Sequence, residues 1–197
     1  MRSAKATRVE LLQLVDRGAE PSSDDPAPAQ GRPVRQPGPE DFSDFYRREL
    51  PGLVVLARAL AGGAVAEDVA QEAMLVVCRR WDHVQRLESP VGWLRGVCMH
   101  KAVSLVRRRS LETRLLRRMG RAAQRPEEPG ESDVLWELVR TLPERQAQAV
   151  ALHYALDLSV ADVAVAMGCA EGTVKAHLAR ARAVLAQIYA ADEEVAR

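Results

Sequence analysis

Apolar residues in this chain recur at steps of three and four, and this spacing limits the possible fold more than any other feature. Side chains at such spacing lie on one face of an α-helix. Aromatic residues make up only 4% of the chain, so a helix-rich core has to be built from small aliphatic side chains. We therefore expect an all-α protein. The first such series reads Phe42, Phe45, Tyr46, Leu50, Leu53, Val54, Ala57 and Leu60.

Glycine, proline and capping residues divide the chain into predicted helices. Gly62 and Gly63 end the first helix, and a second is expected over about residues 66–80. Ser89 is a predicted N-cap before Pro90, the first residue of a third helix that reaches about residue 109. Further helices are expected over about residues 133–141, 143–155, 159–167 and 171–189.

Composition predicts two small helical domains joined by a flexible linker. Residues 19–39 contain six prolines and two glycines but almost no large apolar residues, which is typical of a disordered tail. We therefore interpret residues 1–39 as a Pro-rich N-terminal tail. The remaining predicted divisions are a domain over 40–110, a linker over 111–132, a second domain over 133–190 and a C-terminal tail over 191–197.

Charge is balanced overall but not locally. Lys and Arg total 28 against 27 Asp and Glu, which leaves a formal charge of +1. Residues 107–125 nevertheless hold eight arginines and a single acid, Glu112. Such a basic tract attracts nucleic acid, at least without sequence preference.

The sequence predicts no catalytic site, metal site or cofactor. Cys78, Cys98 and Cys169 match no zinc spacing, and we expect them to be buried thiols in a reducing cytoplasm. The four histidines form no metal-binding pattern, and no glycine-rich phosphate loop is present. No apolar run is long enough to span a bilayer or to act as a signal peptide, so we expect a cytoplasmic protein without membrane insertion.

The stretch from Ser159 to Leu185 predicts a helix-turn-helix. Ser159 and Asp162 resemble a capping box, Gly168 ends the first helix, and a second begins at about Glu171. In this motif the second helix enters the major groove, where small residues allow close approach and cations neutralise phosphates. Two helices of an ordinary bundle are the alternative. The predicted DNA-binding residues are Glu171, Gly172, Thr173, Lys175, Ala176, His177, Ala179, Arg180 and Arg182.

Residues 40–189 together resemble the extracytoplasmic-function sigma factors of bacterial RNA polymerase. The phrases Leu142-Pro143-Glu144-Arg145-Gln146 and Glu171-Gly172-Thr173-Val174-Lys175 resemble region four of these proteins. The stretches FSDFYRRELPGLVVLARALAGG, AEDVAQEAMLVVCRRW and SPVGWLRGVCMHKAVSLVRRR resemble region two. Both the order and the spacing of the two regions fit the family.

The resemblance implies two partners, core RNA polymerase and promoter DNA. In the family, the second helix of region two docks on a coiled coil in the largest polymerase subunit, and exposed acids suit a basic partner helix. A merely solvated acidic face is the alternative. The residues implied in polymerase binding are Glu67, Asp68, Gln71, Glu72 and Leu75.

The next helix and its preceding loop resemble the element that reads and melts the minus-ten region. The resemblance likewise implies that the helix-turn-helix binds the minus-thirty-five element. We expect Trp81 and Trp93 to be core residues rather than base-stacking ones. The residues implied in minus-ten binding are Arg86, Arg95, His100, Lys101, Ser104, Arg107 and Arg108.

Several positions depart from the family pattern, so its promoter sequence cannot be transferred to this chain. His100 and Ser104 stand where Asn and Asp are common, and Ala176-His177 replaces a common Ser-Arg pair. Ala170 occupies the position of the usual serine N-cap.

The function implied is that of a dissociable sigma subunit that directs core polymerase to specific promoters. A stand-alone helix-turn-helix regulator, with residues 40–110 as a dimerisation or sensing domain, is the alternative. An enzyme has little support in the sequence. Members of the family are often held inactive by an anti-sigma factor, which is therefore a further implied partner, although no residue identifies one.

Overall fold

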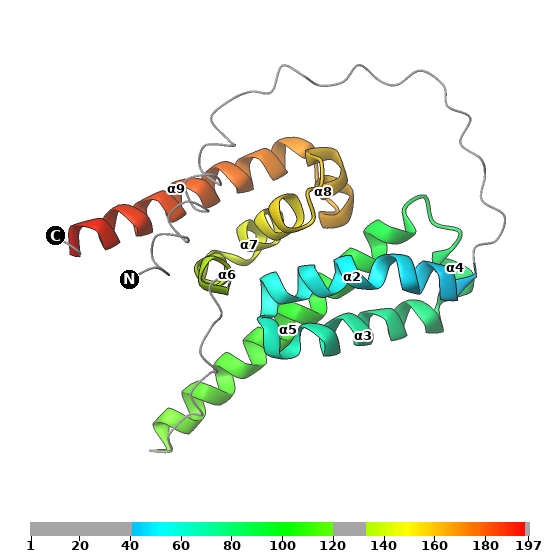
Figure 1. Cartoon of the computed structure of the whole chain (residues 1–197), viewed down its shortest axis with the longest axis horizontal. Helices are drawn as coiled ribbons and strands as arrows, with labels where there is room; N and C mark the ends of the chain where they lie inside the picture. Colours follow the sequence, from blue (N-terminus) through cyan, green and yellow to red (C-terminus); the bar gives the residue numbers. More distant parts are fainter. Residues whose placement is uncertain (1–40, 120–132, 196–197) are drawn as a thin grey trace.

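The computed structural model describes residues 41–119 and 133–195, and the regular elements in these two segments are all helical (Figure 1). The prediction of an all-α protein is confirmed. We call the two segments the N-terminal half and the C-terminal half. The N-terminal half contains α2 (Phe42–Ala61), α3 (Gly63–Arg79), the short α4 (Trp81–Val84) and α5 (Pro90–Arg118). The C-terminal half contains α6 (Asp133–Thr141), α7 (Glu144–Val150), the π-helical turn η1 (Ala151–Ala155), α8 (Val160–Met167) and α9 (Glu171–Val195).

Local signals set two of the helix boundaries as expected. Gly62 has a φ of 93°, a backbone conformation that glycine tolerates best, and its N–H donates to the carbonyl of Arg58 at 3.0 Å. This residue therefore separates α2 from α3, which begins three residues earlier than predicted. Before α5, the hydroxyl oxygen of Ser89 accepts from the N–H of Gly92 at 3.1 Å. The predicted N-cap is confirmed.

Two helices differ from the prediction. Helix α5 continues to Arg118, well beyond the predicted end near residue 109 and eight residues into the stretch expected to be linker. No glycine or proline interrupts it after Gly96, and Arg108 and Glu112 form an ion pair at 3.2 Å one turn apart. The predicted single helix over 143–155 changes to π-helical geometry at Ala151, where Ala151 and Leu152 are both buried.

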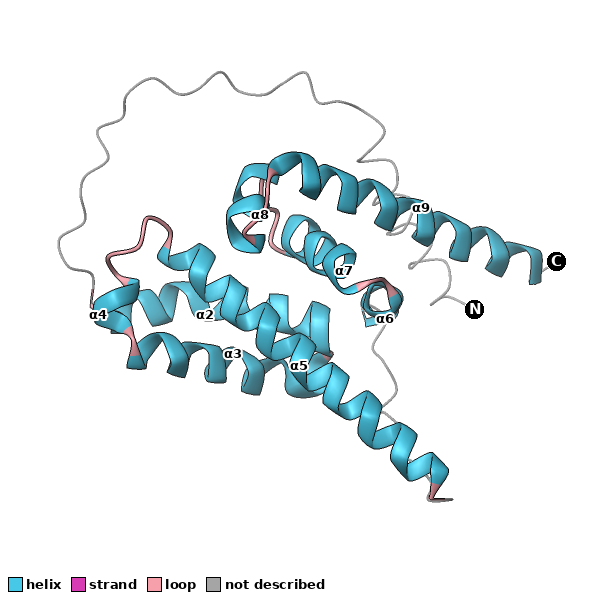
Figure 2. Cartoon of the chain, turned by 180° about the vertical axis from the view of Figure 1, so that it is seen from behind, coloured by secondary structure: helices cyan, strands magenta, loops and turns pink. Residues whose placement is uncertain are grey.

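The core of the N-terminal half lies where α2, α3 and α5 pack together (Figure 2). Trp81 is half-buried beside two aromatic rings, with centroid distances of 5.5 Å to Phe42 and 5.0 Å to Phe45. Trp93 is also half-buried and packs against the core. The core positions predicted for both tryptophans are confirmed.

The two halves pack against each other. Helix α6 and the turn η1 lie on α2, and α8 lies on α5 (Figures 1 and 2). Arg140 at the end of α6 donates to the carbonyls of Arg58 and Ala59 at 3.2 and 3.3 Å, across the end of α2. The sequence alone does not predict whether the two halves contact each other.

The three cysteines do not share one environment. Cys98 is fully buried on α5, Cys169 is half-buried, and Cys78 is exposed. The expectation of buried thiols is therefore wrong for Cys78. This residue lies one position beyond the buried Val77, and a step of one residue turns a side chain by about 100° around the helix axis, here into solvent.

We predict that the burial of Cys98 makes it inert to thiol reagents in the folded protein. Desolvation raises the pKa of this thiol to about 12, so almost none of the reactive thiolate is present at pH 8. Alkylation followed by mass spectrometry is expected to modify Cys78 first, whereas Cys98 reacts only after denaturation. Modification of Cys98 at the rate of Cys78 under native conditions would contradict this packing.

Candidate nucleic-acid interface

The helix-turn-helix is formed by α8, a three-residue turn and α9. The hydroxyl oxygen of Ser159 accepts from the N–H of Asp162 at 3.1 Å, which completes the predicted N-cap of α8. Gly168 adopts the left-handed conformation, with a φ of 62°, and ends the helix as expected. The carbonyl of Ala170 then accepts from the N–H groups of Thr173 and Val174, so Ala170 is the N-cap of α9 and has no side-chain oxygen with which to cap it.

One face of α9 packs inward and the other faces solvent. The inward face consists of Val174, Leu178, Ala181 and Leu185, all fully buried or nearly so. A Cβ atom added at Gly172 would meet nothing within 4 Å, so the backbone at this position is open to an approaching ligand. The exposed members of the predicted set are Glu171, Gly172, Thr173, Lys175, Ala179 and Arg180.

Three members of the same set are less accessible. Ala176 and His177 are half-buried, and the Nδ1 atom of His177 is buried without a hydrogen-bond partner among the described residues. Arg182 is half-buried, and its guanidinium donates to the hydroxyl of Tyr154 at 3.5 Å. The exposed members of the predicted set therefore lie in the first three turns of α9.

On α5, most of the residues implied in minus-ten binding share one face. His100, Lys101, Ser104, Arg107 and Arg108 lie within about a third of the helix circumference, since successive residues turn by about 100°. Arg95 is nine residues before Ser104 and so projects from the opposite side, where it lines a small pocket with Glu49 and Leu156. Arg86 is exposed in the loop before α5. The structure therefore groups five of the seven residues and separates Arg95 from them.

The acidic face of α3 is exposed along its whole length. Glu67, Asp68, Gln71 and Glu72 all face solvent, beside Leu75, whose exposure of 54% is high for a leucine. The opposite side of α3 is buried against α2 and α5. This face therefore combines negative charge with one apolar side chain.

An ion pair joins the α3 face to the α5 face. The ammonium of Lys101 lies 2.8 Å from a carboxylate oxygen of Glu72, and the side chain of Lys101 is 27% exposed against 63% for Glu72. Because the carboxylate is largely solvated, the pair contributes at most about 1 kcal/mol to stability. The pair matters more for its position than for its stability, because a partner that binds Glu72 would remove the carboxylate from Lys101.

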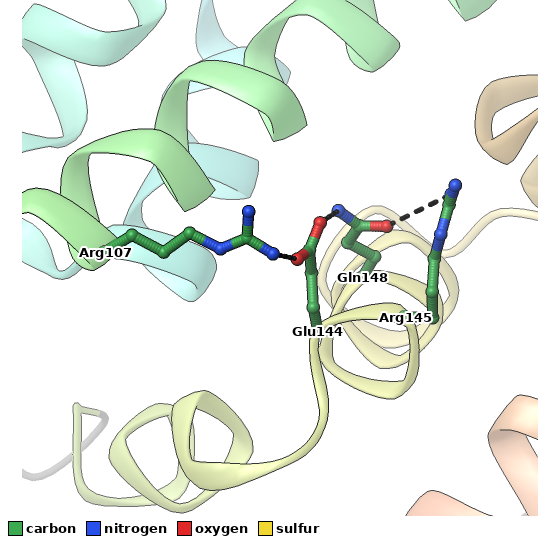
Figure 3. Close-up of polar contacts among 4 residues, drawn as sticks. All are labelled: Arg107, Glu144, Arg145 and Gln148. Atoms are coloured by element: carbon green, nitrogen blue, oxygen red, sulfur yellow. Dashed lines mark hydrogen bonds and ion pairs between the residues drawn. The ribbon is translucent and has the colours of Figure 1, made fainter.

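A polar network that the sequence did not reveal connects α5 to the helix-turn-helix (Figure 3). Arg107 forms an ion pair with Glu144, whose second carboxylate oxygen accepts from the amide of Gln148 at 3.2 Å. Arg145 donates to Gln148 at 3.5 Å and to the carbonyl of Met167 at 3.4 Å, at the end of α8. Glu144 and Arg145 belong to a phrase that carried the family resemblance, but nothing in their spacing pointed to a partner on α5.

Within residues 41–119 and 133–195, no group of three or more His, Cys, Asp or Glu side chains is arranged to hold a metal ion. The same residues contain no helix with the length and apolar character needed to cross a membrane.

Comparison with known proteins assigns both halves to one family. Residues 45–112 match the family described as "Sigma-70 region 2", and residues 132–185 match "Sigma-70, region 4". The ECF RNA polymerase sigma factor SigM of Mycobacterium tuberculosis is 30% identical over 149 residues, which are 75% of this chain and 76% of that protein. The RNA polymerase sigma-E factor of Streptomyces avermitilis is 28% identical over 148 residues, or 74% and 83% of the two chains.

Solved structures show the same fold. The sigma factor RpoE of Bartonella quintana, solved in complex with the anti-sigma factor NepR, is 26% identical, with a TM-score of 0.58 over 77% of this chain and 98% of that one. CnrH, solved in complex with the cytosolic domain of CnrY, is 22% identical, with a TM-score of 0.56 over 77% of this chain and 88% of that one.

The missing cap of α9 generates a prediction. Replacing Ala170 with Ser supplies an oxygen for the free N–H groups at the start of α9, so we expect the free energy of unfolding to rise by about 1 kcal/mol. Urea unfolding of the full chain measures this change. The matched control is Ala183→Ser at an exposed position in the interior of α9, where Ser lowers stability by a few tenths of a kcal/mol. A loss of stability in Ala170→Ser would contradict the assigned N-cap.

Proposed function

The chain belongs to the extracytoplasmic-function sigma factors of the sigma-70 family, and we propose how its two halves share the work of such a subunit. As a sigma subunit it directs core RNA polymerase to promoters. In our proposal α9 reads the minus-thirty-five element, α5 and its preceding loop bind the minus-ten element, and α3 docks on the largest polymerase subunit. Sigma factors are in general regulatory subunits without enzymatic activity. We propose that this chain likewise catalyses no reaction and that it acts in the cytoplasm.

The observation that carries the minus-thirty-five proposal is the solvent-facing surface of α9 directly after a left-handed turn. Residues in the first turns of a recognition helix contact base edges, whereas cations nearby hold phosphates and fix the register. Lys175 and Arg180 are exposed on this surface and suit phosphates. Gly172 and Ala179 leave room for the backbone to approach the groove.

The minus-ten proposal depends on the common face of α5. His100 and Ser104 offer hydrogen bonds to bases or phosphates, and Lys101, Arg107 and Arg108 supply cations for the backbone. Opening a duplex requires cations that hold the displaced strand, and three of them lie along two turns of this helix. Arg95 projects elsewhere, so we assign it no direct contact in this proposal.

The polymerase proposal depends on charge and on one apolar residue. Glu67, Asp68 and Glu72 give α3 a negative face that complements a basic partner helix, with Gln71 as a hydrogen-bonding group. Leu75 is exposed beside them and supplies apolar area to such a contact.

We also propose an anti-sigma factor as a regulatory partner. The similar sigma factor RpoE of Bartonella quintana was solved in complex with the anti-sigma factor NepR. A protein of this kind that covers the α3 face would prevent polymerase binding. Co-purification of the tagged chain from its host, with and without charge reversal on α3, tests this proposal.

Run-off transcription with core polymerase on a promoter library tests the proposed function. We expect transcription from a defined subset of promoters, and at least a tenfold loss for the double variant Asp68→Arg, Glu72→Arg, because reversed charges repel a basic partner. A higher protein concentration should restore activity, since the defect lies in polymerase affinity. The control is Asp44→Arg, an exposed acid on α2. Specific DNA binding by the chain alone, without any stimulation of polymerase, would favour the stand-alone regulator instead.

A second prediction concerns a variant that should lose DNA binding while keeping its fold. Gly172→Leu places a side chain in open space, so the fold should be retained and the melting temperature unchanged or higher. The same side chain blocks close approach of α9 to the major groove, and we expect affinity for a minus-thirty-five duplex to fall at least tenfold in a fluorescence anisotropy titration. Ala183→Leu, at an exposed position about three turns beyond Gly172 and outside the predicted DNA-binding set, is the matched control. Unchanged binding by Gly172→Leu would remove α9 from the interface.

A further inference from the structure

The proposed minus-ten face and the proposed polymerase surface are joined through one ion pair. Each of the three cations on the minus-ten face is paired with an acid. The three pairs are Lys101 with Glu72 at 2.8 Å, Arg107 with Glu144, and Arg108 with Glu112 at 3.2 Å. Among these acids, only Glu72 also belongs to the surface of α3 proposed to bind polymerase. The pair of Lys101 and Glu72 therefore belongs to both proposed binding sites.

Glu72 lies among the residues proposed to contact polymerase. It is four residues after Asp68 and three before Leu75, so the three side chains share one stripe of the helix. Its side chain is 63% exposed, and a basic partner that docks on this stripe can reach its carboxylate although Lys101 is already there. The cation of the partner and Lys101 then compete for the same carboxylate.

The packing of α3 against α5 holds Lys101 close to this stripe. Ala73 follows Glu72 and Ala102 follows Lys101, and both alanines are fully buried. Because small side chains let the two helices lie close together, the ammonium of Lys101 reaches the carboxylate across the edge of their contact. The side chain of Lys101 is only 27% exposed, so it is held near Glu72 rather than extended into solvent.

A DNA phosphate competes with Glu72 for Lys101. The phosphate and the carboxylate are both anions, and they repel each other when both lie beside the same ammonium. Binding polymerase through Glu72 and binding DNA through Lys101 therefore each disrupt the ion pair. When both partners are bound, the pair is lost once rather than twice, so each partner strengthens the binding of the other. For a pair exposed to this degree, the factor is roughly 1.4 to 5.

We propose that Glu72 couples polymerase binding to minus-ten DNA binding through Lys101. The inference deepens the proposed function and rests on it. In the free chain Glu72 withholds Lys101 from nucleic acid, and polymerase that engages Glu72 releases it. The coupling is reciprocal, because DNA that engages Lys101 releases Glu72 for polymerase. Glu72 is thus a positioning residue for DNA, since it acts through Lys101 and does not itself contact the phosphates.

The effect of Glu72 on Lys101 is measured first in the free full-length chain. The probe is a fluorescent single-stranded oligonucleotide of mixed sequence, because a phosphate contact does not depend on base identity. In an anisotropy titration, Glu72→Gln is expected to bind this probe roughly 1.4 to 5 times more tightly than the unaltered chain. The control is Asp82→Asn, which removes the same charge at an exposed position of α4 outside both surfaces and should give a smaller gain.

The variant Lys101→Met tests whether the gain acts through Lys101. Methionine keeps much of the apolar length of lysine but carries no charge, so the fold should be retained. In this background Glu72→Gln should have no further effect on affinity for the probe. Lys101→Met should also lower the slope of log affinity against log salt concentration by about 0.7, the value for one phosphate contact on a single strand. A purely structural role of Lys101 would leave that slope unchanged.

Core polymerase should abolish the gain. Each protein is saturated with core polymerase, and its affinity is measured for a promoter fragment that the run-off assay identifies. The unaltered chain and Glu72→Gln should then bind this fragment equally, because polymerase already occupies Glu72 in the unaltered chain. The converse measurement is the rise in affinity for core polymerase when the fragment is added. This rise should be smaller in Lys101→Met by the factor found with the free chain.

The outcomes separate this inference from the proposed function. Equal binding of the probe by Glu72→Gln and the unaltered chain, together with normal transcription, would overturn the coupling and leave the sigma role intact. A gain that persists in the Lys101→Met background, or that is as large in the polymerase complex, would overturn it as well. A gain in the free chain without transcription from the unaltered chain would overturn the proposed function, and with it the role of polymerase, while supporting the hold of Glu72 on Lys101.

Discussion

The close packing of helices through small side chains is the constraint on which the rest of this structure depends. Among the aromatic side chains that the structure describes, only Phe45 is fully buried, and most of the buried residues of α2 and α3 are alanines and valines. Side chains this small allow helix backbones to lie near each other. The many dispersion contacts between the closely spaced atoms then stabilise the core without large aromatic rings. Twelve alanines belong to the core: Ala57, Ala59, Ala66, Ala70, Ala73, Ala102, Ala147, Ala149, Ala151, Ala164, Ala166 and Ala181.

Because the helices pack through small side chains, their outward faces remain available for recognition. A helix that buries a narrow stripe of small residues can present charged or polar side chains over most of its circumference. Helix α3 shows this plainly, because its inward positions are all apolar while its acids form a continuous exposed face. Helix α9 likewise buries Val174 and Leu178 and presents Lys175 and Arg180 to solvent.

Local signals in the sequence were sufficient to predict most of the helices and the helix-turn-helix. The sequence predicted the longer helices but not the four-residue α4, and Ser89, Ser159 and Gly168 marked three boundaries by interactions within a few residues. What the sequence could not provide were contacts between residues far apart in the chain. The partners of Arg140 and Glu144 lie across the contact between the halves, so no local pattern indicates them. The end of α5 is a different case, because the lack of any glycine or proline between Gly96 and Arg118 is visible in the sequence and was not used. Composition suggested a flexible linker, but it says nothing about whether the segments on either side pack together.

Helix α5 therefore has several structural roles at once, and a single sequence pattern does not reveal all of them. Its buried stripe, with Leu94, Cys98 and Ala102, holds the N-terminal half together. Its glycines at 92 and 96 admit α8, while its polar face carries Lys101 and Arg107, each already paired with an acid, Glu72 or Glu144. A cation that is paired in the free protein must exchange that partner before it can hold a phosphate. If α3 engages polymerase through Glu72, Lys101 becomes available at the step when DNA arrives, so binding to polymerase and binding to DNA are coupled through the same helix.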